Sequence, residues 1–143
     1  ATRGALLPLL EQQPAASVVV NRTVATAQQL GSSFAHAGPV SATGYGELGA
    51  QQFDVVLNAT SASLRAELPP LPTTVFAPGA LAYELAYGKG LTPFLLLAQG
   101  AGVQRLADGV GMLAEQAAEA FEWWRGVRPG TKDVIAQLTV PLV

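Results

Sequence analysis

Arg22 lies directly after the valine run Val18–Val20, at a point where a nucleotide-binding α/β protein can read the ribose of its cofactor. A carboxylate there would hydrogen-bond the 2′-hydroxyl of NAD, whereas an arginine offers a charge-assisted, bidentate partner for the 2′-phosphate of NADP. Asn21 and Thr23 add neutral donors beside it. The alternative is a surface arginine next to a helix start, and the spacing alone does not separate the two interpretations.

Small polar residues also follow a second apolar run, Phe53–Leu57, in the sequence Asn58-Ala59-Thr60-Ser61. Ligands of open α/β sheets bind outside the carboxyl ends of the strands, so these side chains can face a cofactor. A polar turn with a purely structural role is the alternative.

A third group opens the longest helical pattern, where Asp108 is followed by Gly109 and Gly111. Glycines there permit close backbone approach and leave amides for an anion or an amide ligand. Alternatively, Asp108 simply caps the helix. Gln116 lies among alanines of the same helix, where it either hydrogen-bonds a ligand or faces solvent.

The composition limits the classes of partner. Among 143 residues, half are hydrophobic and the formal net charge is −2, which gives no bulk attraction to nucleic acid or to an anionic membrane. The chain has no cysteine and one histidine, so neither a disulfide framework nor a Cys/His metal site is expected. The longest apolar run, Leu91–Ala98, contains Pro93 and is much shorter than the roughly 20 residues of a spanning helix. We expect a cytoplasmic protein.

Short apolar strands alternate with helical patterns, which predicts an α/β fold with a Rossmann-like, doubly wound parallel sheet. The expected strands are Val18–Val20, Val40–Ala42, Phe53–Leu57, Thr74–Phe76, Leu81–Leu85 and Val103–Leu106, and the expected helices are Ala5–Gln13, Val24–His36, Thr92–Gln99, Asp108–Gly126 and Lys132–Leu138. The strands Val18–Val20 and Phe53–Leu57 are expected to be buried, the first of them on both faces, and Val40–Ala42 is expected to be an edge strand. Thr23 is expected to cap its helix through its hydroxyl.

One strand is missing from this pattern, because a βαβ unit needs a strand before its crossover helix and this chain opens on the helix. The ribose-reading residue lies about 20 positions after the glycine-rich turn. Counting back from Arg22 places that turn at or just before residue 1. We therefore expect a sheet truncated before its first strand, with that strand and most of the glycine loop preceding Ala1.

Five stretches together, ATRGALLPLL, NRTVATAQQL, FDVVLNATSASL, YELAYGKGLTPFLLLA and DGVGMLAEQAAEAFEWW, resemble the C-terminal, NADP-binding domain of shikimate dehydrogenases over nearly all of the chain. The resemblance implies that residues 1–143 are one NADP-binding domain of an enzyme that reversibly reduces 3-dehydroshikimate to shikimate with NADPH. The family's catalytic lysine and aspartate belong to an N-terminal substrate domain, so no catalytic residue is expected here. Lys89 does not match that lysine.

The resemblance also assigns site residues. Ala1 would end the glycine loop around the pyrophosphate, the segment from Asn21 to Thr26 would surround the 2′-phosphate, and Leu85 and Gly109 would line the nicotinamide. The expected cofactor-binding residues are Ala1, Asn21, Arg22, Thr23, Thr26, Thr60, Leu85 and Gly109, and the expected substrate-binding residues are Tyr87 and Gln116.

The chain departs from the family pattern at two places. Thr26 stands where a second basic residue is common, and Tyr83-Glu84 stands where Tyr-Asp is common. Cofactor discrimination would then depend mainly on Arg22. A relative acting on quinate and a non-catalytic nucleotide-binding module are the alternative functions.

Overall fold

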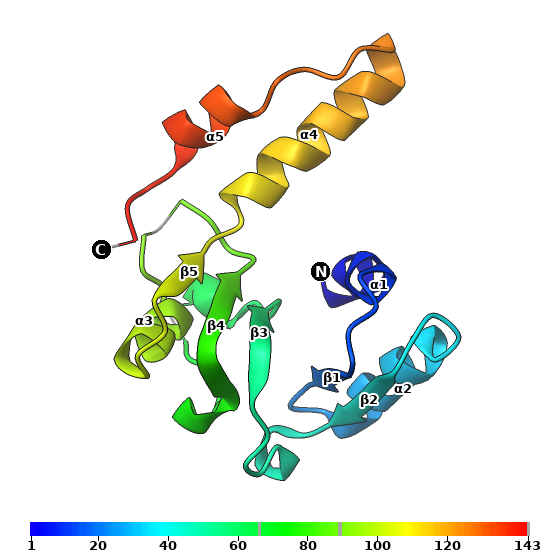
Figure 1. Cartoon of the computed structure of the whole chain (residues 1–143), viewed down its shortest axis with the longest axis vertical. Helices are drawn as coiled ribbons and strands as arrows, with labels where there is room; N and C mark the ends of the chain where they lie inside the picture. The colour runs from blue at the N-terminus through cyan, green and yellow to red at the C-terminus, as the bar shows by residue number, and fades with distance from the viewer. Residues whose placement is uncertain (66, 89, 143) are drawn as a thin grey trace. The chain divides into compact units, whose positions relative to one another are not determined.

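The computed structural model describes residues 1–65, 67–88 and 90–142 (Figure 1). Lys89, named above, lies outside the described residues. The strands are β1 Ser17–Val20, β2 Val40–Thr43, β3 Phe53–Asn58, β4 Phe76–Glu84 and β5 Arg105–Ala107. The helices are α1 Thr2–Glu11, α2 Val24–Phe34, α3 Pro93–Gly100, α4 Val110–Arg125 and α5 Lys132–Leu138, with short 3₁₀ turns η1 Tyr45–Glu47, η2 Ala62–Arg65 and η3 Thr73–Val75.

The chain divides into two compact units, and each is described by itself. Unit 1 comprises residues 1–51 with 70–75, and unit 2 comprises residues 52–69 with 76–143. In unit 1, β1 pairs with β2 in parallel, and in unit 2 the parallel strand order is β3-β4-β5. The predicted α/β class with parallel strands is confirmed. None of the described helices has both the length and the apolar character that a membrane crossing requires.

The core of unit 1 forms where α1 and α2 meet the valine strand. Leu6, Leu10, Val19 and Ala27 are buried together there. A Cβ on Gly31 would lie 3.4 Å from the Cβ of Ala42, so α2 packs closely on β2.

Helix α1 begins at Thr2, earlier than the predicted Ala5, and contains Pro8 in its interior. Proline removes one intrahelical hydrogen bond and disfavours this position. The helix persists because Leu6 and Leu10, on either side of Pro8, are buried. Here tertiary packing outweighs local propensity.

The core of unit 2 lies between its sheet and the helices that follow. Phe94, Leu95 and Ala98 of α3 are fully buried, and the rings of Phe94 and Phe76 have centroids 6.2 Å apart. Thr92 caps α3, because its Oγ1 accepts a hydrogen bond from the amide of Leu95 at 3.3 Å, and Pro93 occupies the first helical position. This helix start was predicted and is confirmed.

The prediction of separate strands at Thr74–Phe76 and Leu81–Leu85 was wrong, because β4 runs continuously from Phe76 to Glu84 and includes Pro78-Gly79. Phe53 of β3 pairs with Phe76 and Val55 pairs with Leu81, so the register shifts between the two pairs. The extra residues of β4 form an irregular bulge in which Gly79 has a φ of 77°. Thr74 and Val75 lie in η3 instead of a strand.

The two valine-rich strands are less buried than predicted. Val19 is buried, but Val18 and Val20 are only partly so, and Val55 of β3 is 50% exposed. Within the described residues, β1 pairs only with β2 and β3 pairs only with β4. Each is therefore an edge strand of its own sheet, which accounts for the exposure.

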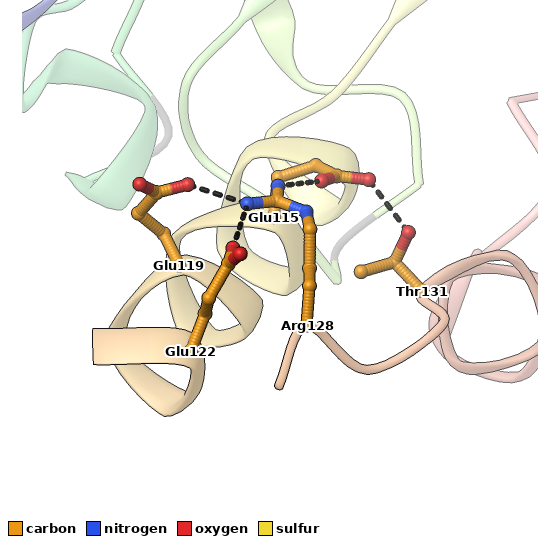
Figure 2. Close-up of polar contacts among 5 residues, drawn as sticks. All are labelled: Glu115, Glu119, Glu122, Arg128 and Thr131. Atoms are coloured by element: carbon orange, nitrogen blue, oxygen red, sulfur yellow. Dashed lines mark hydrogen bonds and ion pairs between the residues drawn. The ribbon is translucent and has the colours of Figure 1, made fainter. Parts of the chain in front are cut away.

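An exposed polar cluster joins the end of α4 to the segment before α5 (Figure 2). The guanidinium of Arg128 pairs with Glu115 at 2.9 Å, Glu119 at 2.5 Å and Glu122 at 3.1 Å. Thr131 Oγ1 donates to the other oxygen of Glu115 at 2.6 Å. These contacts fix the turn that follows Gly126, the left-handed residue at which α4 ends.

This cluster predicts a pH-dependent and salt-dependent contribution to stability. The hydroxyl of Thr131 and the guanidinium of Arg128 lower the pKa of Glu115 below its ordinary value of 4.5. A lowered carboxyl pKa stabilises the folded state above the ordinary value, and this stabilisation disappears as the pH falls through the lowered value. We expect Glu115→Gln to lower the thermal unfolding midpoint slightly at pH 7, and the difference from the wild type to diminish as the pH falls below 4.5.

The effect should also vanish in about 1 M salt, because the Debye length there is about 3 Å. Glu11→Gln, which replaces an exposed glutamate at the end of α1, is the matched control. A Glu115→Gln difference that does not diminish as the pH falls below 4.5 and as salt is added would contradict the electrostatic origin.

Candidate functional site

In unit 1, a tight turn at the carboxyl end of β1 presents Arg22. The amide of Asn21 donates to the carbonyl of Thr43 at 3.3 Å, which continues the β1–β2 pairing by one residue. The Oδ1 of Asn21 accepts a hydrogen bond from the amide of Thr23 at 3.0 Å. Arg22, between the two, is exposed. Asn21 therefore shapes the turn through its side chain.

Arg22 forms no salt bridge with any residue that the structure describes. Its charge does act on Tyr45 of η1, which follows β2. Burial raises the pKa of the Tyr45 hydroxyl, and the charge of Arg22 opposes this shift. The sequence interpretation missed Tyr45. The signal lies in the register, because Thr43 pairs with Val20 and so the residues after Thr43 lie beside the Asn21 turn.

Thr23 does not cap α2 through its hydroxyl, and that prediction was wrong. Its carbonyl instead accepts hydrogen bonds from the amides of Thr26 and Ala27 at 3.0 and 3.4 Å. The Oδ1 of Asn21 accepts from the Thr23 amide and so closes the turn that precedes α2. Thr23 and Thr26 are both exposed and lie three residues apart at the start of α2, on neighbouring positions of one face.

Ala1 is the exposed N-terminal flanking residue of α1, and its carbonyl accepts from the amides of Gly4 and Ala5 at 2.9 and 3.2 Å. The first amides of a helix have no intrahelical acceptor and favour negative charge. This geometry agrees with the predicted place of Ala1 beside a pyrophosphate, which stays a prediction.

In unit 2, the start of α4 packs against the segment that follows β4. The amide of Gly109 donates to the carbonyl of Ala86 at 3.1 Å. A Cβ on Gly109 would lie 2.1 Å from the carbonyl oxygen of Leu85 and 3.4 Å from Cδ1 of Tyr87. Gly109 is buried and has a φ of −77°, so this position requires glycine for the close approach and not for its backbone angles. The structure thus brings together Leu85, Tyr87 and Gly109, three of the predicted site residues.

Asp108 precedes α4, and its Oδ1 accepts a hydrogen bond from the amide of Val110 at 3.1 Å. The N-cap position itself is occupied by Gly109, so the alternative interpretation of Asp108 as the N-cap was wrong. The Oδ2 of Asp108 is buried and has no hydrogen-bond partner among the residues that the structure describes. Burial raises the pKa of the nearby Tyr83 hydroxyl; a hydrogen bond with the Met112 backbone lowers it, and the charge of Asp108 raises it further. Tyr83 therefore stays protonated at neutral pH.

Thr60 lies in the loop after β3, and its polar groups are used within that loop. Its amide and its hydroxyl donate to Oδ1 of Asn58 at 3.2 and 2.9 Å, and its Oγ1 accepts from the amide of Ala62 at 3.2 Å. Asn58 itself is 4% exposed. The structure therefore favours the structural interpretation for Asn58, while Thr60 is exposed at the edge of the loop.

Gln116 is exposed on α4, seven residues beyond Gly109, which is about 10 Å along the helix axis. It is not in the Leu85–Tyr87–Gly109 group, whereas Tyr87 is in that group and is 47% exposed.

A shallow hollow of about 460 Å³ in unit 2 is lined by Gln99, Gly102, Val103, Gln104, Leu106 and Leu142, which include none of the predicted site residues. Among the described residues, no cluster of His, Cys, Asp or Glu has a metal-binding arrangement.

Comparison with known proteins identifies the family. The sequence profile of the shikimate 5′-dehydrogenase C-terminal domain matches residues 109–139. The chain is 56% identical over 138 residues to the shikimate dehydrogenase (NADP(+)) of Nitrosospira multiformis, and the match covers 96% of this chain and 50% of that protein. The chain thus spans about half the length of the curated relatives it matches.

Solved structures agree with this assignment. An Ael1 enzyme from Pseudomonas putida superposes with a TM-score of 0.93 at 60% identity, over 99% of this chain and 52% of that one. The shikimate 5-dehydrogenase of Thermus thermophilus, solved in complex with NADP(H) and shikimate, superposes with a TM-score of 0.72 at 28% identity, over 88% of this chain and 46% of that one. With these likenesses along nearly its whole length, the chain belongs to the shikimate dehydrogenase family.

Proposed function

We propose that residues 1–143 form the NADP-binding domain of an NADP-dependent shikimate dehydrogenase, which reversibly reduces 3-dehydroshikimate to shikimate. In this proposal the catalytic lysine and aspartate belong to an N-terminal substrate domain. NADPH supplies the hydride when bound, and this chain supplies the groups that hold and orient the cofactor. A cytoplasmic location is part of the same proposal.

The observation that carries the proposal is the exposed guanidinium of Arg22 in unit 1. It is exposed at the carboxyl end of β1, and no described carboxylate pairs with it. A guanidinium held in this way fits the 2′-phosphate of NADP, with Asn21, Thr23 and Thr26 as neutral neighbours and Ala1 at the pyrophosphate. The half-buried hydroxyl of Tyr45 adds a donor that the sequence interpretation did not include.

Unit 2 supports the nicotinamide end of the same proposal. The cradle at Gly109, which a Cβ would fill, leaves the Leu85 carbonyl and the Tyr87 ring against the start of α4. A backbone carbonyl can accept a hydrogen bond from the NH₂ group of a carboxamide. We assign Leu85, Gly109 and Thr60 to the cofactor and the exposed side chains of Tyr87 and Gln116 to the substrate.

The test is steady-state kinetics of the protein that carries this chain behind a substrate domain. We expect oxidation of NADPH that depends on 3-dehydroshikimate, and a much smaller rate with NADH. Activity on 3-dehydroquinate in preference to 3-dehydroshikimate would identify a quinate-type relative instead. Binding of NADPH without turnover of either substrate would identify a non-catalytic nucleotide-binding module.

A further inference from the structure

Unit 2 contains a buried polar network centred on Glu84, the last residue of β4. Glu84 is fully buried. Its Oε2 accepts hydrogen bonds from Nδ2 of Asn58 at 2.9 Å and from Oγ1 of Thr92 at 3.0 Å. Its Oε1 accepts from the backbone amide of Ala86 at 3.2 Å. A fully buried carboxyl group is rare in a protein core and needs such partners to be tolerated.

The network joins three segments that are distant in the sequence. Asn58 ends β3 and pairs in register with Glu84, and its carbonyl accepts from the amide of Leu85 at 3.0 Å. Its Oδ1 holds the amide and the hydroxyl of Thr60. Thr92 begins α3. Glu84 thus connects the loop after β3, the loop after β4 and the first turn of a buried helix.

Two of these segments carry the proposed site. On the Oε2 side, one intermediate residue, Asn58, separates Glu84 from Thr60. On the Oε1 side, Glu84 fixes the amide of Ala86, whose own carbonyl accepts from Gly109 at 3.1 Å. Ala86 lies between Leu85 and Tyr87, so its peptide orientation determines where both of them point.

We propose that Glu84 is a positioning residue for the nicotinamide end of the site, which it sets by holding the Thr60 loop and the Leu85–Tyr87 segment in one arrangement. This inference rests on the proposed function for its kinetic consequence. Glu84 is not expected to touch the cofactor or the substrate. Its role depends on two acceptor oxygens: Oε2 accepts from Asn58 and Thr92, and Oε1 accepts from the amide of Ala86.

Glutamine at position 84 has nearly the same shape but only one acceptor oxygen. If its amide nitrogen takes the Oε1 position, it faces the Ala86 amide donor. If the nitrogen takes the Oε2 position, it faces the amide nitrogen of Asn58, whose Oδ1 is already engaged by Thr60. Either orientation places two donors against each other where the wild type has a donor and an acceptor, which destabilises the local arrangement. Aspartate is one methylene shorter but keeps both acceptor oxygens.

The experiment compares Glu84→Gln, Glu84→Asp and the exposed control Glu119→Gln in the protein that carries this chain behind a substrate domain. Amide hydrogen exchange is measured in residues 58–62 and 84–88, and α2 is the internal reference. Binding of adenosine 2′,5′-bisphosphate, a probe that lacks the nicotinamide, is measured by calorimetry. Steady-state kinetics with NADPH and NADH complete the set.

For Glu84→Gln we expect faster exchange in both segments, unchanged exchange in α2, and unchanged affinity for the bisphosphate. We expect kcat to fall roughly 10- to 100-fold, as for displaced positioning groups, with the ratio of NADPH to NADH use unchanged. Glu84→Asp should recover part of the rate, and Glu119→Gln should resemble the wild type.

Exchange in Glu84→Gln equal to that in Glu119→Gln would overturn the proposal. A kcat lower in Glu84→Asp than in Glu84→Gln would also overturn the proposal. The length of the side chain, and not its pair of acceptor oxygens, would then determine the rate. If Glu84→Gln does not fold, Glu84→Asp decides by itself: loss of bisphosphate binding in it would overturn the positioning role in favour of a general structural one. A wild type without dehydrogenase activity would refute the proposed function, while the exchange pattern would still decide the role of Glu84.

Discussion

Replacing Arg22 with alanine is expected to weaken NADPH binding by roughly 10- to 100-fold, because a hydrogen bond to a charged group contributes about 1.5–3 kcal/mol. NADH has no 2′-phosphate, so its KM should change little. No described residue pairs with Arg22, and therefore its removal leaves no buried charge behind. The measurement is the KM for each cofactor in the protein that carries this chain behind a substrate domain, together with calorimetric binding of adenosine 2′,5′-bisphosphate.

Arg105→Ala is the matched control, because Arg105 is an exposed arginine at the start of β5. Equal losses with NADPH and NADH in Arg22→Ala would contradict the phosphate-binding role. A second arm, Thr26→Arg, restores a basic residue at the position where the family commonly has one. We expect it to tighten bisphosphate binding, provided that Arg22 is the main cation of that pocket.

Replacing Gly109 with alanine is expected to be the most damaging small substitution in unit 2. The added Cβ would lie 2.1 Å from a backbone oxygen of Leu85, and a backbone atom cannot yield as a flexible side chain can. Overpacking of this kind costs about 1–3 kcal/mol and occasionally more. We expect the free energy of unfolding to fall by about 3 kcal/mol, and NADPH turnover to fall with it, because the Leu85–Tyr87 segment must move away from α4.

Gly111→Ala provides an internal comparison two residues further along α4. A Cβ there meets nothing within 4 Å, and alanine favours a helix over glycine, so the variant should be neutral or more stable by up to about 1 kcal/mol. Urea unfolding of both variants gives the difference directly. If Gly109→Ala were as stable as Gly111→Ala, the close approach to Leu85 would not be required.

The parts of the fold that follow from local sequence were predictable. Alternation of apolar strands with helices indicated the parallel α/β class, and Thr92-Pro93 indicated the start of α3, because capping and proline preferences act within one turn. The continuous β4 was not predictable. A Pro-Gly pair usually marks a turn, and only pairing with β3 on both sides of it keeps the strand in one piece.

Among the candidate site residues, too, those marked by local sequence were predictable and those defined by strand pairing were not. Arg22 was singled out because it follows an apolar strand at the place of a ribose-reading residue, and Gly109 because it opens a helical pattern. Tyr45 and Glu84 were not assigned a role, since their importance comes from residues that only the sheet register brings near them. The cap expected from the Thr23 hydroxyl is absent, and the side chain of Asn21 instead accepts a hydrogen bond from the Thr23 amide. Local competition of this kind between neighbouring polar side chains is not visible in spacing alone.

The tryptophans at the far end of α4 have a practical consequence. Trp123 and Trp124 are the two indoles of the chain and are 84% and 79% exposed. They lie in the same continuous helix that Gly109 begins, about 20 Å along its axis. Indole emission overlaps the absorption of a reduced nicotinamide ring, and a separation of about 20 Å is within reach of resonance energy transfer. The chain therefore carries its own fluorescent donor, and quenching of it during a titration would report whether reduced cofactor has docked without any added label.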